Sequence, residues 1–336
     1  MKMAFPWQLS LALTKYLVKN KLLGRKRFPL LLMLEPSLRC NLSCEGCGRV
    51  REFRSAPAQM LSAGECLAAV EEARTPVVAV SGGEPLLHPE IEQIVREITA
   101  RKRFVYLTTN GLLLEKSLEK FKPGPYFSFV LHLDGLAESH NRLAGQEGVF
   151  ETAIAGMKLA KQAGFRVLTN TTIYKGTSPA EIEQLFLLLS RIPVDGMMVA
   201  PAFSYEAVDG DVFLSRDEIK DFFSSLNGLR RRFPFYNTPI YLDFLSGEEE
   251  LTCTPWGNPT RSPGGWRKPC YLITDDYCQS LGELLEETPW EKYGAGNDPR
   301  CANCMTHCGF EASAINETGK NLANIWRTIR WHFAGG

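Results

Sequence analysis

The sequence has no excess of charge of either sign. Its 336 residues include 38 lysines and arginines and 38 aspartates and glutamates, so the formal net charge is +0. A protein that binds nucleic acid usually carries a strong basic excess, because it has to neutralise phosphate groups. The balance of charges therefore argues against a nucleic-acid partner.

The sequence also lacks a secretion signal, since residues 1–34 contain no apolar core followed by a small-residue cleavage site. We therefore expect a cytoplasmic protein whose 10 cysteines stay reduced. Clustered reduced thiols are more often metal ligands or catalytic groups than disulfide partners. The cysteines thus point to metal chemistry.

No apolar run predicts a membrane-spanning helix. The N-terminal stretch Phe5–Leu23 is interrupted by Lys15, Lys19 and Lys21 and is followed by Gly-Arg-Lys-Arg at residues 24–27. It is either a helix packed on the wall of the main domain or a helix lying in a membrane surface, with basic groups toward lipid phosphates. The second interpretation predicts peripheral contact with the inner face of the membrane.

Six short apolar runs alternate with helix-like segments, a pattern typical of a parallel sheet covered by helices. The runs are Leu30–Leu34, Val77–Ser81, Phe104–Thr108, Phe127–Leu133, Arg166–Ile173 and Gly196–Ala200. The helix-like segments are Ser62–Ala73, Glu90–Ala100, Phe150–Ala163 and Ala180–Arg191. Six such units predict an α/β fold, a partial (β/α)6 TIM-type barrel.

The alternation of apolar runs and helix-like segments ends after the sixth run. Residues 214–233 predict one more helix, and from Thr238 onward proline, glycine and cysteine dominate. We therefore expect an amphipathic N-terminal segment at residues 1–28, the barrel core at residues 29–235, and a loop-rich C-terminal module containing cysteines at residues 236–336.

Three cysteines, Cys40, Cys44 and Cys47, follow the first apolar run with the spacing CxxxCxxC. Active sites of such barrels lie on loops at the carboxyl ends of strands, so these thiols can converge on one metal centre. Thiolates select zinc or iron–sulfur clusters over hard cations. Structural zinc sites usually have four ligands in two short knuckles, whereas this loop offers three thiols. The motif favours a four-iron cluster in which one iron has no protein ligand.

This motif resembles that of the radical SAM superfamily, in which the open iron of a [4Fe–4S] cluster binds the amino and carboxylate groups of S-adenosylmethionine (SAM). The resemblance implies that the cluster held by Cys40, Cys44 and Cys47 cleaves SAM into methionine and a 5′-deoxyadenosyl radical. In the superfamily the residue before the third cysteine is commonly aromatic and packs near the adenine. Here that residue is Gly46, so other groups have to hold the adenine.

Motifs after the second and third runs resemble those with which the superfamily binds SAM. Gly82, Gly83, Glu84 and Pro85 follow the second run. Glycines let the backbone approach a ligand closely, and a carboxylate accepts hydrogen bonds from the SAM ammonium group. Asn110 follows the third run in the sequence Thr-Thr-Asn-Gly, a usual ending for that strand of the superfamily.

Polar residues at the end of the fourth run are candidates for binding the ribose. His132 and Asp134 are two residues apart and therefore point to the same face of a strand. The alternative for His132 is a histidine satisfied within a polar barrel interior. Asn170 and Thr172 on the fifth run are candidates of the same kind. Arg142 is either a ligand of the SAM carboxylate or a solvated side chain.

The C-terminal cysteines have the composition of a second thiolate site. Cys253, Cys270 and Cys278 precede a CxxCxxxC motif. The preferred ligands are Cys270, Cys301, Cys304 and Cys308. They hold a second iron–sulfur cluster or a zinc ion, or they are free thiols in a loop lid. Cys66 lies in a helical segment, and we expect it to be buried and inert.

Seven blocks spread over the chain resemble a single family. They are Leu32–Pro36, Leu112–Lys116, His132–Leu136, Gln146–Phe150, Cys253–Arg261, Arg267–Leu272 and Cys301–Gly309. They are similar to blocks of the radical SAM adenosylhopene transferases of hopanoid biosynthesis. The C-terminal blocks are not general features of radical SAM proteins, so they carry the specific part of the resemblance.

The resemblance implies an unusual reaction on an apolar substrate. The 5′-deoxyadenosyl radical would add to the terminal alkene of hopene and form a carbon–carbon bond, and the resulting carbon radical would then be quenched to give adenosylhopane. A reducing partner such as flavodoxin or ferredoxin would supply electrons. A polycyclic lipid suits an enzyme whose N-terminal helix lies on a membrane surface.

The chain departs from this family at two positions. The family's third strand ends Leu-Cys-Thr-Asn, but Thr108 stands at the cysteine position, and Gly145 replaces another family cysteine. A hydroxyl does not give up a hydrogen atom as readily as a thiol. Either another group, such as Tyr106, quenches the adduct, or the chain is a paralog that abstracts hydrogen from another apolar or isoprenoid substrate and releases 5′-deoxyadenosine. A third hypothesis is a non-enzymatic iron–sulfur or metal-binding protein.

Overall fold

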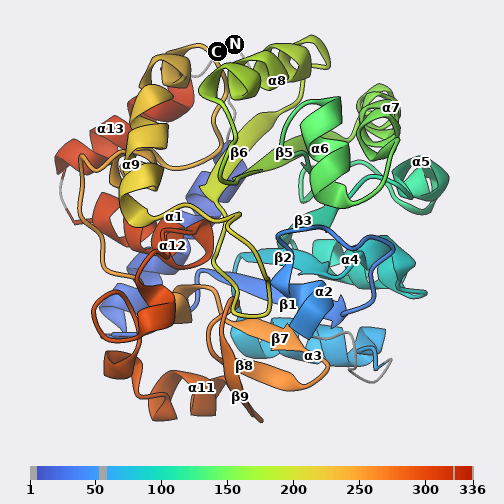
Figure 1. Ribbon diagram of the computed structural model, residues 1–336. Coiled ribbons are helices and arrows are strands. Elements are labelled where there is room, and N and C mark those ends of the chain that lie inside the picture. The colour runs from blue at the N-terminus through green and yellow to red at the C-terminus, as the bar shows by residue number, and fades with distance from the viewer. Residues whose placement is uncertain (1–5, 53–58, 321, 335–336) are drawn as a thin grey trace.

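One sheet runs through the centre of the molecule (Figure 1). The computed structural model describes residues 6–52, 59–320 and 322–334, and in this part of the chain nine strands are ordered β6-β5-β4-β3-β2-β1-β7-β8-β9. Strands β1 to β6 pair in parallel. Their bounds are β1 Leu31–Ser37, β2 Val77–Gly82, β3 Phe104–Thr109, β4 Phe127–His132, β5 Arg166–Ile173 and β6 Gly196–Pro201. These strands confirm the predicted α/β fold and partial barrel.

Helices lie between the parallel strands along the chain. The four predicted ones are α3 Ala63–Ala73, α4 Ile91–Ala100, α7 Val149–Gln162 and α8 Pro179–Arg191. Helix α3 begins after Ser62 because that side chain accepts a hydrogen bond from the Glu65 amide while the Glu65 carboxylate accepts one from the Ser62 amide. Shorter elements complete the region: α2 Gly48–Glu52, η1 Pro85–Leu87, α5 Leu114–Ser117, η2 Leu118–Lys120 and α6 Ala137–Ala144.

The alternation of side chains along β3 separates the main core from the inside of the barrel. Val105 and Leu107 are buried in the large hydrophobic core that also includes the inner faces of α3, α4, α7 and α8. Tyr106 and Thr108 point to the other side of the strand and are only partly buried. The expected site face is therefore the one that carries Thr108.

The C-terminal part contains more regular structure than the sequence predicted. The expected helix over residues 214–233 is shorter, since α9 spans Arg216–Ser225 and a 3-10 turn, η3, follows at Asn227–Arg231. Strand β7 Thr260–Ser262 pairs in parallel with β1, and β8 Gly265–Pro269 and β9 Thr274–Cys278 extend the sheet antiparallel (Figure 1, orange). The remaining elements are α10 Pro239–Leu245, η4 Pro255–Gly257, α11 Leu281–Glu287, η5 Trp290–Lys292, η6 Pro299–Cys301, α12 His307–Thr318 and α13 Leu322–Ala334. The domain boundary at residue 235 stays a prediction.

The N-terminal helix α1, Trp7–Leu22, covers the amino ends of the parallel strands. Leu9 is 1% exposed and packs with Val77 and Phe104, the first residues of β2 and β3. This contact agrees with the first of the two interpretations, a helix packed on the main domain. The opposite side of α1 still exposes large apolar side chains, including Trp7 at 61% and Leu22 at 82%. No helix in the described residues is long and apolar enough to cross a membrane.

A buried carboxylate joins β1 to the C-terminal strands. Glu35 of β1 and Arg267 of β8 are both fully buried, and a distance of 2.6 Å separates Glu35 Oε2 from Arg267 Nη2. Arg49 of α2 lies 3.8 Å from the other carboxylate oxygen. Burial raises the pKa of Glu35, and the Arg49 guanidinium acts against that rise. Glu35 is therefore a shared partner of two guanidinium groups in the interior of the protein.

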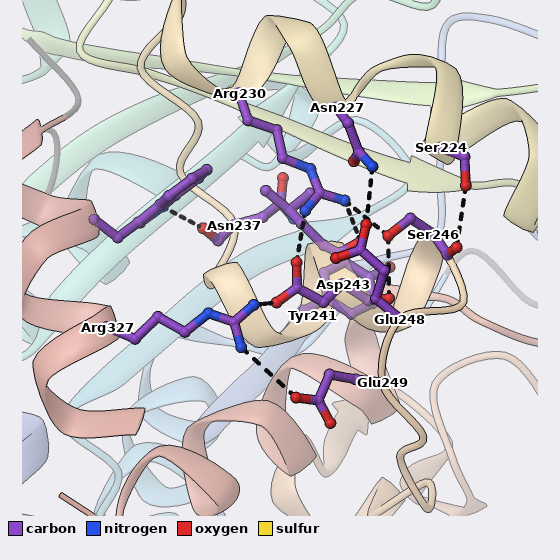
Figure 2. A network of polar contacts seen from close by, with 12 residues as sticks. Ser224, Asn227, Arg230, Asn237, Tyr241, Asp243, Ser246, Glu248, Glu249 and Arg327 are labelled. Carbon is purple, nitrogen blue, oxygen red and sulfur yellow. Dashed lines mark hydrogen bonds and ion pairs between the residues drawn. The ribbon is translucent and has the colours of Figure 1, made fainter. Parts of the chain in front are cut away.

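A second buried carboxylate holds the C-terminal helices together (Figure 2). Asp243 of α10 accepts from Arg230 at 2.6 Å and also pairs with Arg327 of α13. Arg230 donates further to the Ser246 hydroxyl at 3.0 Å, and Arg327 lies 3.6 Å from Glu249. Asp243 is therefore the common partner of two guanidinium groups from different parts of the chain.

We expect Asp243→Ala to lower the free energy of unfolding by about 3–5 kcal/mol, because it leaves two guanidinium groups without their shared carboxylate in a largely buried place. Urea unfolding followed by circular dichroism measures this loss. The matched control is Asp209→Ala, at an exposed position, which should change stability by less than about 0.5 kcal/mol. Equal stabilities of the two variants would contradict the assigned role of Asp243.

Candidate cluster and SAM site

The loop that carries the three N-terminal cysteines lies between β1 and α2, at the carboxyl ends of the parallel strands. Arg51 of α2 donates to the carbonyl oxygens of Cys44 and Cys47, at 3.0 Å each. The Glu45 amide donates to the carbonyl of Leu143 in α6 at 2.7 Å. The loop is thus fastened to the next helix and to a helix after β4, at the edge where barrel active sites lie.

Cys47 is close enough to Cys40 and Cys44 to affect the ionisation of these two thiols. Burial raises the pKa of Cys40, and burial raises that of Cys44 to about 12, with Cys47 adding to both shifts. A metal binds the thiolate, so metal binding here releases protons. Three soft sulfur donors on one loop fit a [4Fe–4S] cluster with one open iron. In the described residues, no group of three or more His, Cys, Asp or Glu side chains already has the geometry to hold a metal ion.

The two glycines after β2 allow the cysteine loop to approach the strand end. A Cβ on Gly82 would lie 2.3 Å from the carbonyl oxygen of Ser37, and one on Gly83 would lie 2.0 Å from that of Arg39. Gly82 also has a φ of +110°, a value that favours glycine. The Gly83 amide donates to Ser37 at 3.0 Å and the Glu84 amide to Arg39 at 2.8 Å. This motif therefore positions the chain immediately before Cys40.

Glu84 is buried beneath the site and joins the ends of β2 and β3. Its carboxylate accepts from the Thr109 hydroxyl and the Asn110 amide, both at 2.9 Å, and from the Leu86 amide at 3.0 Å. Burial raises the pKa of Glu84, and these donors lower it. The Asn110 side chain donates to Asn41 in the cysteine loop at 2.8 Å. Pro85 begins the turn η1 and is buried.

The polar residues at the ends of β4 and β5 form one hydrogen-bonded group. His132 Nε2 lies 3.1 Å from the Asp134 carboxylate and 2.9 Å from the Thr172 hydroxyl. The Thr172 amide donates to Asp134 at 2.7 Å. Asn170 is in register with His132 on the neighbouring strand and is partly buried. Arg142 is exposed and pairs with Glu45 of the cysteine loop at 3.0 Å.

Two tyrosines cover the glycines on either side of Cys47. A Cβ on Gly46 would lie 2.2 Å from Cε1 of Tyr174, and a Cβ on Gly48 would lie 2.1 Å from Cγ of Tyr205. Tyr174 follows β5, and its ring therefore occupies the space that a side chain at position 46 would need. Sequence analysis identified the missing aromatic at position 46 but not Tyr174, because the contact joins residues far apart in the chain.

The remaining candidates for quenching lie at different depths in the barrel. Thr108 faces the inside of the barrel in register with Val130 of β4, two residues before His132. Tyr106, two residues earlier on the same face, shares a 2.7 Å hydrogen bond with the Tyr236 hydroxyl. Burial raises the pKa of Tyr106 well above its ordinary value. The Tyr106 hydroxyl is therefore neutral near pH 7, and it is already hydrogen-bonded to Tyr236.

A histidine of the C-terminal part, which the sequence did not single out, also lies near this region. His307, the first residue of α12, is close enough to His132 that the His132 imidazole helps to lower the pKa of His307. Burial is the larger cause, and together they lower the pKa of His307 to about 4. His307 is therefore neutral at pH 7. Its position in the Thr-His-Cys sequence carried no signal that α12 begins beside the barrel.

The C-terminal cysteines line one pocket. The predicted ligands Cys270, Cys301, Cys304 and Cys308 all border it. Cys253 borders it as well, although it lies outside the CxxCxxxC motif. The pocket and the cysteine loop are separated by Tyr205 and Tyr271. Cys66 is fully buried in α3, as expected.

Comparisons with known families follow the two halves of the chain. Residues 34–189 match the Radical SAM superfamily, and residues 197–328 match a domain of unknown function, DUF3463. Residues 34–189 therefore carry the radical SAM part of the chain, and members of that superfamily use a [4Fe–4S] cluster and SAM.

Curated relatives match mainly the first half. The AdoMet-dependent heme synthase of Methanosarcina barkeri is 34% identical over 169 residues, which cover 49% of this chain and 48% of that protein. The GTP 3′,8-cyclase of Microcystis aeruginosa is 26% identical over 260 residues, which cover 70% of this chain and 78% of that protein. The chain thus spans about half the length of the heme synthase that it matches.

Solved structures share the fold. Streptococcus suis SuiB superposes with a TM-score of 0.67 at 19% identity, covering 88% of this chain and 75% of SuiB. The enzyme anSMEcpe with bound AdoMet has a TM-score of 0.56 at 17% identity and covers 91% of this chain and 97% of its own. These similarities confirm the radical SAM fold.

We expect Gly46→Ala to cost about 1–3 kcal/mol of stability, since the added methyl group overlaps the buried ring of Tyr174. Tyr174→Ala removes the overlap, so the double variant should be more stable than the sum of the two single losses predicts. Urea unfolding of the four proteins measures this coupling. Gly124→Ala is the control, because a Cβ there meets nothing within 4 Å. If the stability losses of the two single variants simply added up in the double variant, the contact between position 46 and Tyr174 would be contradicted.

Proposed function

We propose that this chain is a radical SAM enzyme that reductively cleaves SAM and adds the 5′-deoxyadenosyl group to the alkene of a hopene-like lipid. The observation that carries the SAM chemistry is the loop of three cysteines between β1 and α2, at the carboxyl edge of the barrel. When bound, the cluster and SAM supply a 5′-deoxyadenosyl radical, with an electron from a flavodoxin- or ferredoxin-type partner. The lipid substrate rests on the resemblance of both halves of the chain to adenosylhopene transferases.

The chain's own residues would hold SAM around the cysteine loop. The hydrogen-bonded group of His132, Asp134 and Thr172 offers polar contacts to the ribose from β4 and β5. Gly82, Gly83 and the neighbouring strand ends would receive the methionine part. We assign the adenine contact to Tyr174, because its ring fills the space beside Cys47 that an aromatic side chain at position 46 would otherwise fill.

SAM cleavage consumes one electron. The addition then requires one further electron and one proton to quench the carbon radical. The new bond joins C5′ to the terminal alkene carbon, the alkene π bond breaks, and one unpaired electron stays on the neighbouring carbon. Thr108 does not give up a hydrogen atom readily, and the Tyr106 hydroxyl is engaged by Tyr236. We therefore assign the second electron to the same reducing partner and the proton to water.

A second candidate function follows from the residue at position 108. Because a hydroxyl stands at Thr108 where the adenosylhopene transferases have a thiol, the chain is alternatively a paralog that abstracts hydrogen from another apolar or isoprenoid substrate. This reaction releases free 5′-deoxyadenosine and leaves no nucleoside on the product. The two reactions therefore differ in the fate of the adenosyl group.

Membrane contact through α1 fits a lipid substrate. Trp7, Leu11, Val18 and Leu22 are exposed and spaced 4, 7 and 4 residues apart, which places them in one stripe of the helix. Lysines flank the stripe, and the exposed basic residues 25–27 follow the helix. Exposed apolar side chains bordered by basic groups suit the surface of an anionic bilayer.

Incubation with adenosyl-labelled SAM, a reductant and a bacterial lipid extract under anaerobic conditions tests the function. We expect the label in a lipid-soluble product whose mass equals lipid plus adenosyl group, detected by mass spectrometry. Stoichiometric free 5′-deoxyadenosine with no labelled lipid would support the hydrogen-abstracting alternative. Intact SAM after reduction of the reconstituted protein would reject both enzymatic hypotheses.

Two variants make this experiment specific. Cys40→Ala should abolish SAM cleavage, because two remaining thiolates do not hold a cluster with one open iron. The control Cys66→Ala removes a buried thiol of α3 and should leave cleavage unchanged. Thr108→Cys adds a hydrogen donor inside the barrel and should raise the share of label found in lipid.

For the membrane contact, we expect the protein to co-sediment with phosphatidylglycerol-containing vesicles more than with pure phosphatidylcholine vesicles. The double variant Trp7→Ser with Leu22→Ser should lower this partitioning at least about tenfold, since each side chain loses apolar burial. Leu187→Ser, at another exposed leucine on α8, is the control. Equal partitioning of all three proteins would exclude α1 as the contact.

A further inference from the structure

Five cysteines from separate parts of the C-terminal half line one pocket of about 690 Å³, part of it open to solvent. They come from the loop before η4, the residue after β8, the turn η6, the loop that follows it, and the first turn of α12. They are Cys253, Cys270, Cys301, Cys304 and Cys308. Such a convergence brings together sulfur donors that lie up to 55 positions apart in the sequence (308 − 253).

The chemistry of the lining selects a soft metal. The pocket contains no carboxylate, imidazole, lysine or arginine among its lining residues, so sulfur is its dominant donor. Apolar side chains such as Phe203, Leu272 and Ile273 enclose the thiols. Thiolates bind zinc or iron–sulfur clusters and not hard cations.

Local hydrogen bonds already point at the sulfur atoms. The Ile273 amide donates to Cys270 Sγ at 3.4 Å. The Thr306 hydroxyl lies 3.4 Å from Cys304 Sγ and 3.2 Å from Cys308 Sγ, between two thiols of the motif. Hydrogen bonds to ligand sulfurs stabilise the thiolate form and orient the ligands of a metal centre.

We propose that this pocket binds a second [4Fe–4S] cluster through Cys270, Cys301, Cys304 and Cys308. These four cysteines pack in one hydrophobic group with Phe203, Leu272 and Ile273. Cys253 packs instead against the main core, where its sulfur lies 2.3 Å from the place of a Cβ on Gly309. Four thiolates complete the ligands of a four-iron cluster, so this centre has no open iron and does not bind SAM.

One layer of side chains lies between this pocket and the first cysteine loop. Tyr205 covers Gly48, next to Cys47, and packs in the same hydrophobic group as Cys308. Tyr271 packs in that group too, and the Arg49 guanidinium lies 4.5 Å from its ring centre. The two centres are therefore neighbours across Tyr205, Tyr271 and Arg49, and a second cluster here would lie close to the first.

The test counts iron and sulfide in the full chain after anaerobic reconstitution. Wild type should contain about eight irons and eight sulfides, the content of two [4Fe–4S] clusters. The triple variant Cys40→Ala, Cys44→Ala, Cys47→Ala should keep about four irons and show the low-temperature EPR signal of a reduced cluster. SAM should leave that signal unchanged. This measurement does not require SAM cleavage, so its outcome is independent of the proposed function.

Two further variants, made in the triple variant, assign the ligands. Adding Cys301→Ser and Cys304→Ser should remove the remaining iron, whereas adding Cys278→Ser, at a buried cysteine of β9 outside the pocket, should not. A triple variant without iron, or with about one zinc ion that excludes iron, would overturn the proposal. The triple variant alone decides this, so the result does not depend on whether the C-terminal substitutions fold.

Discussion

The buried carboxylate of Glu35 is the interaction on which the arrangement of the two halves depends. It pairs with two guanidinium groups, one from Arg267 of β8 and one from Arg49 of α2. A buried ion pair contributes little net stability, but loss of one member leaves an uncompensated charge and costs about 3–5 kcal/mol. Because α2 begins immediately after Cys47, Glu35 links the position of the cysteine loop to the C-terminal strands.

The two family matches divide the chain near residue 190, yet the structure joins the two parts. Strand β7 pairs in parallel with β1, and β8 and β9 continue the same sheet. His307 of α12 is near enough to His132 for the second imidazole to help lower its pKa. The C-terminal half thus contributes to the surroundings of the proposed SAM site.

The six parallel strands and their helices could be predicted because buried parallel strands form continuous apolar runs. The cysteine loop and the polar strand ends could be predicted because their motifs stand within a few residues of the ends of predicted strands. Strands β7 to β9 could not, since β7 has three residues and its pairing with β1 joins distant segments. Tyr174 and His307 were missed for the same reason, because each meets its partner only through tertiary contacts.

The place of α1 determines how a membrane-bound molecule would be oriented. Leu9 packs at the amino ends of β2 and β3, whereas the cysteine loop lies at the carboxyl ends. Six residues of a strand such as β3 span about 20 Å. With α1 against the bilayer, the mouth of the barrel would therefore face the aqueous side. A hydrophobic substrate would have to leave the lipid phase entirely before it reaches the site, so extraction from the bilayer becomes a separate step ahead of the chemistry.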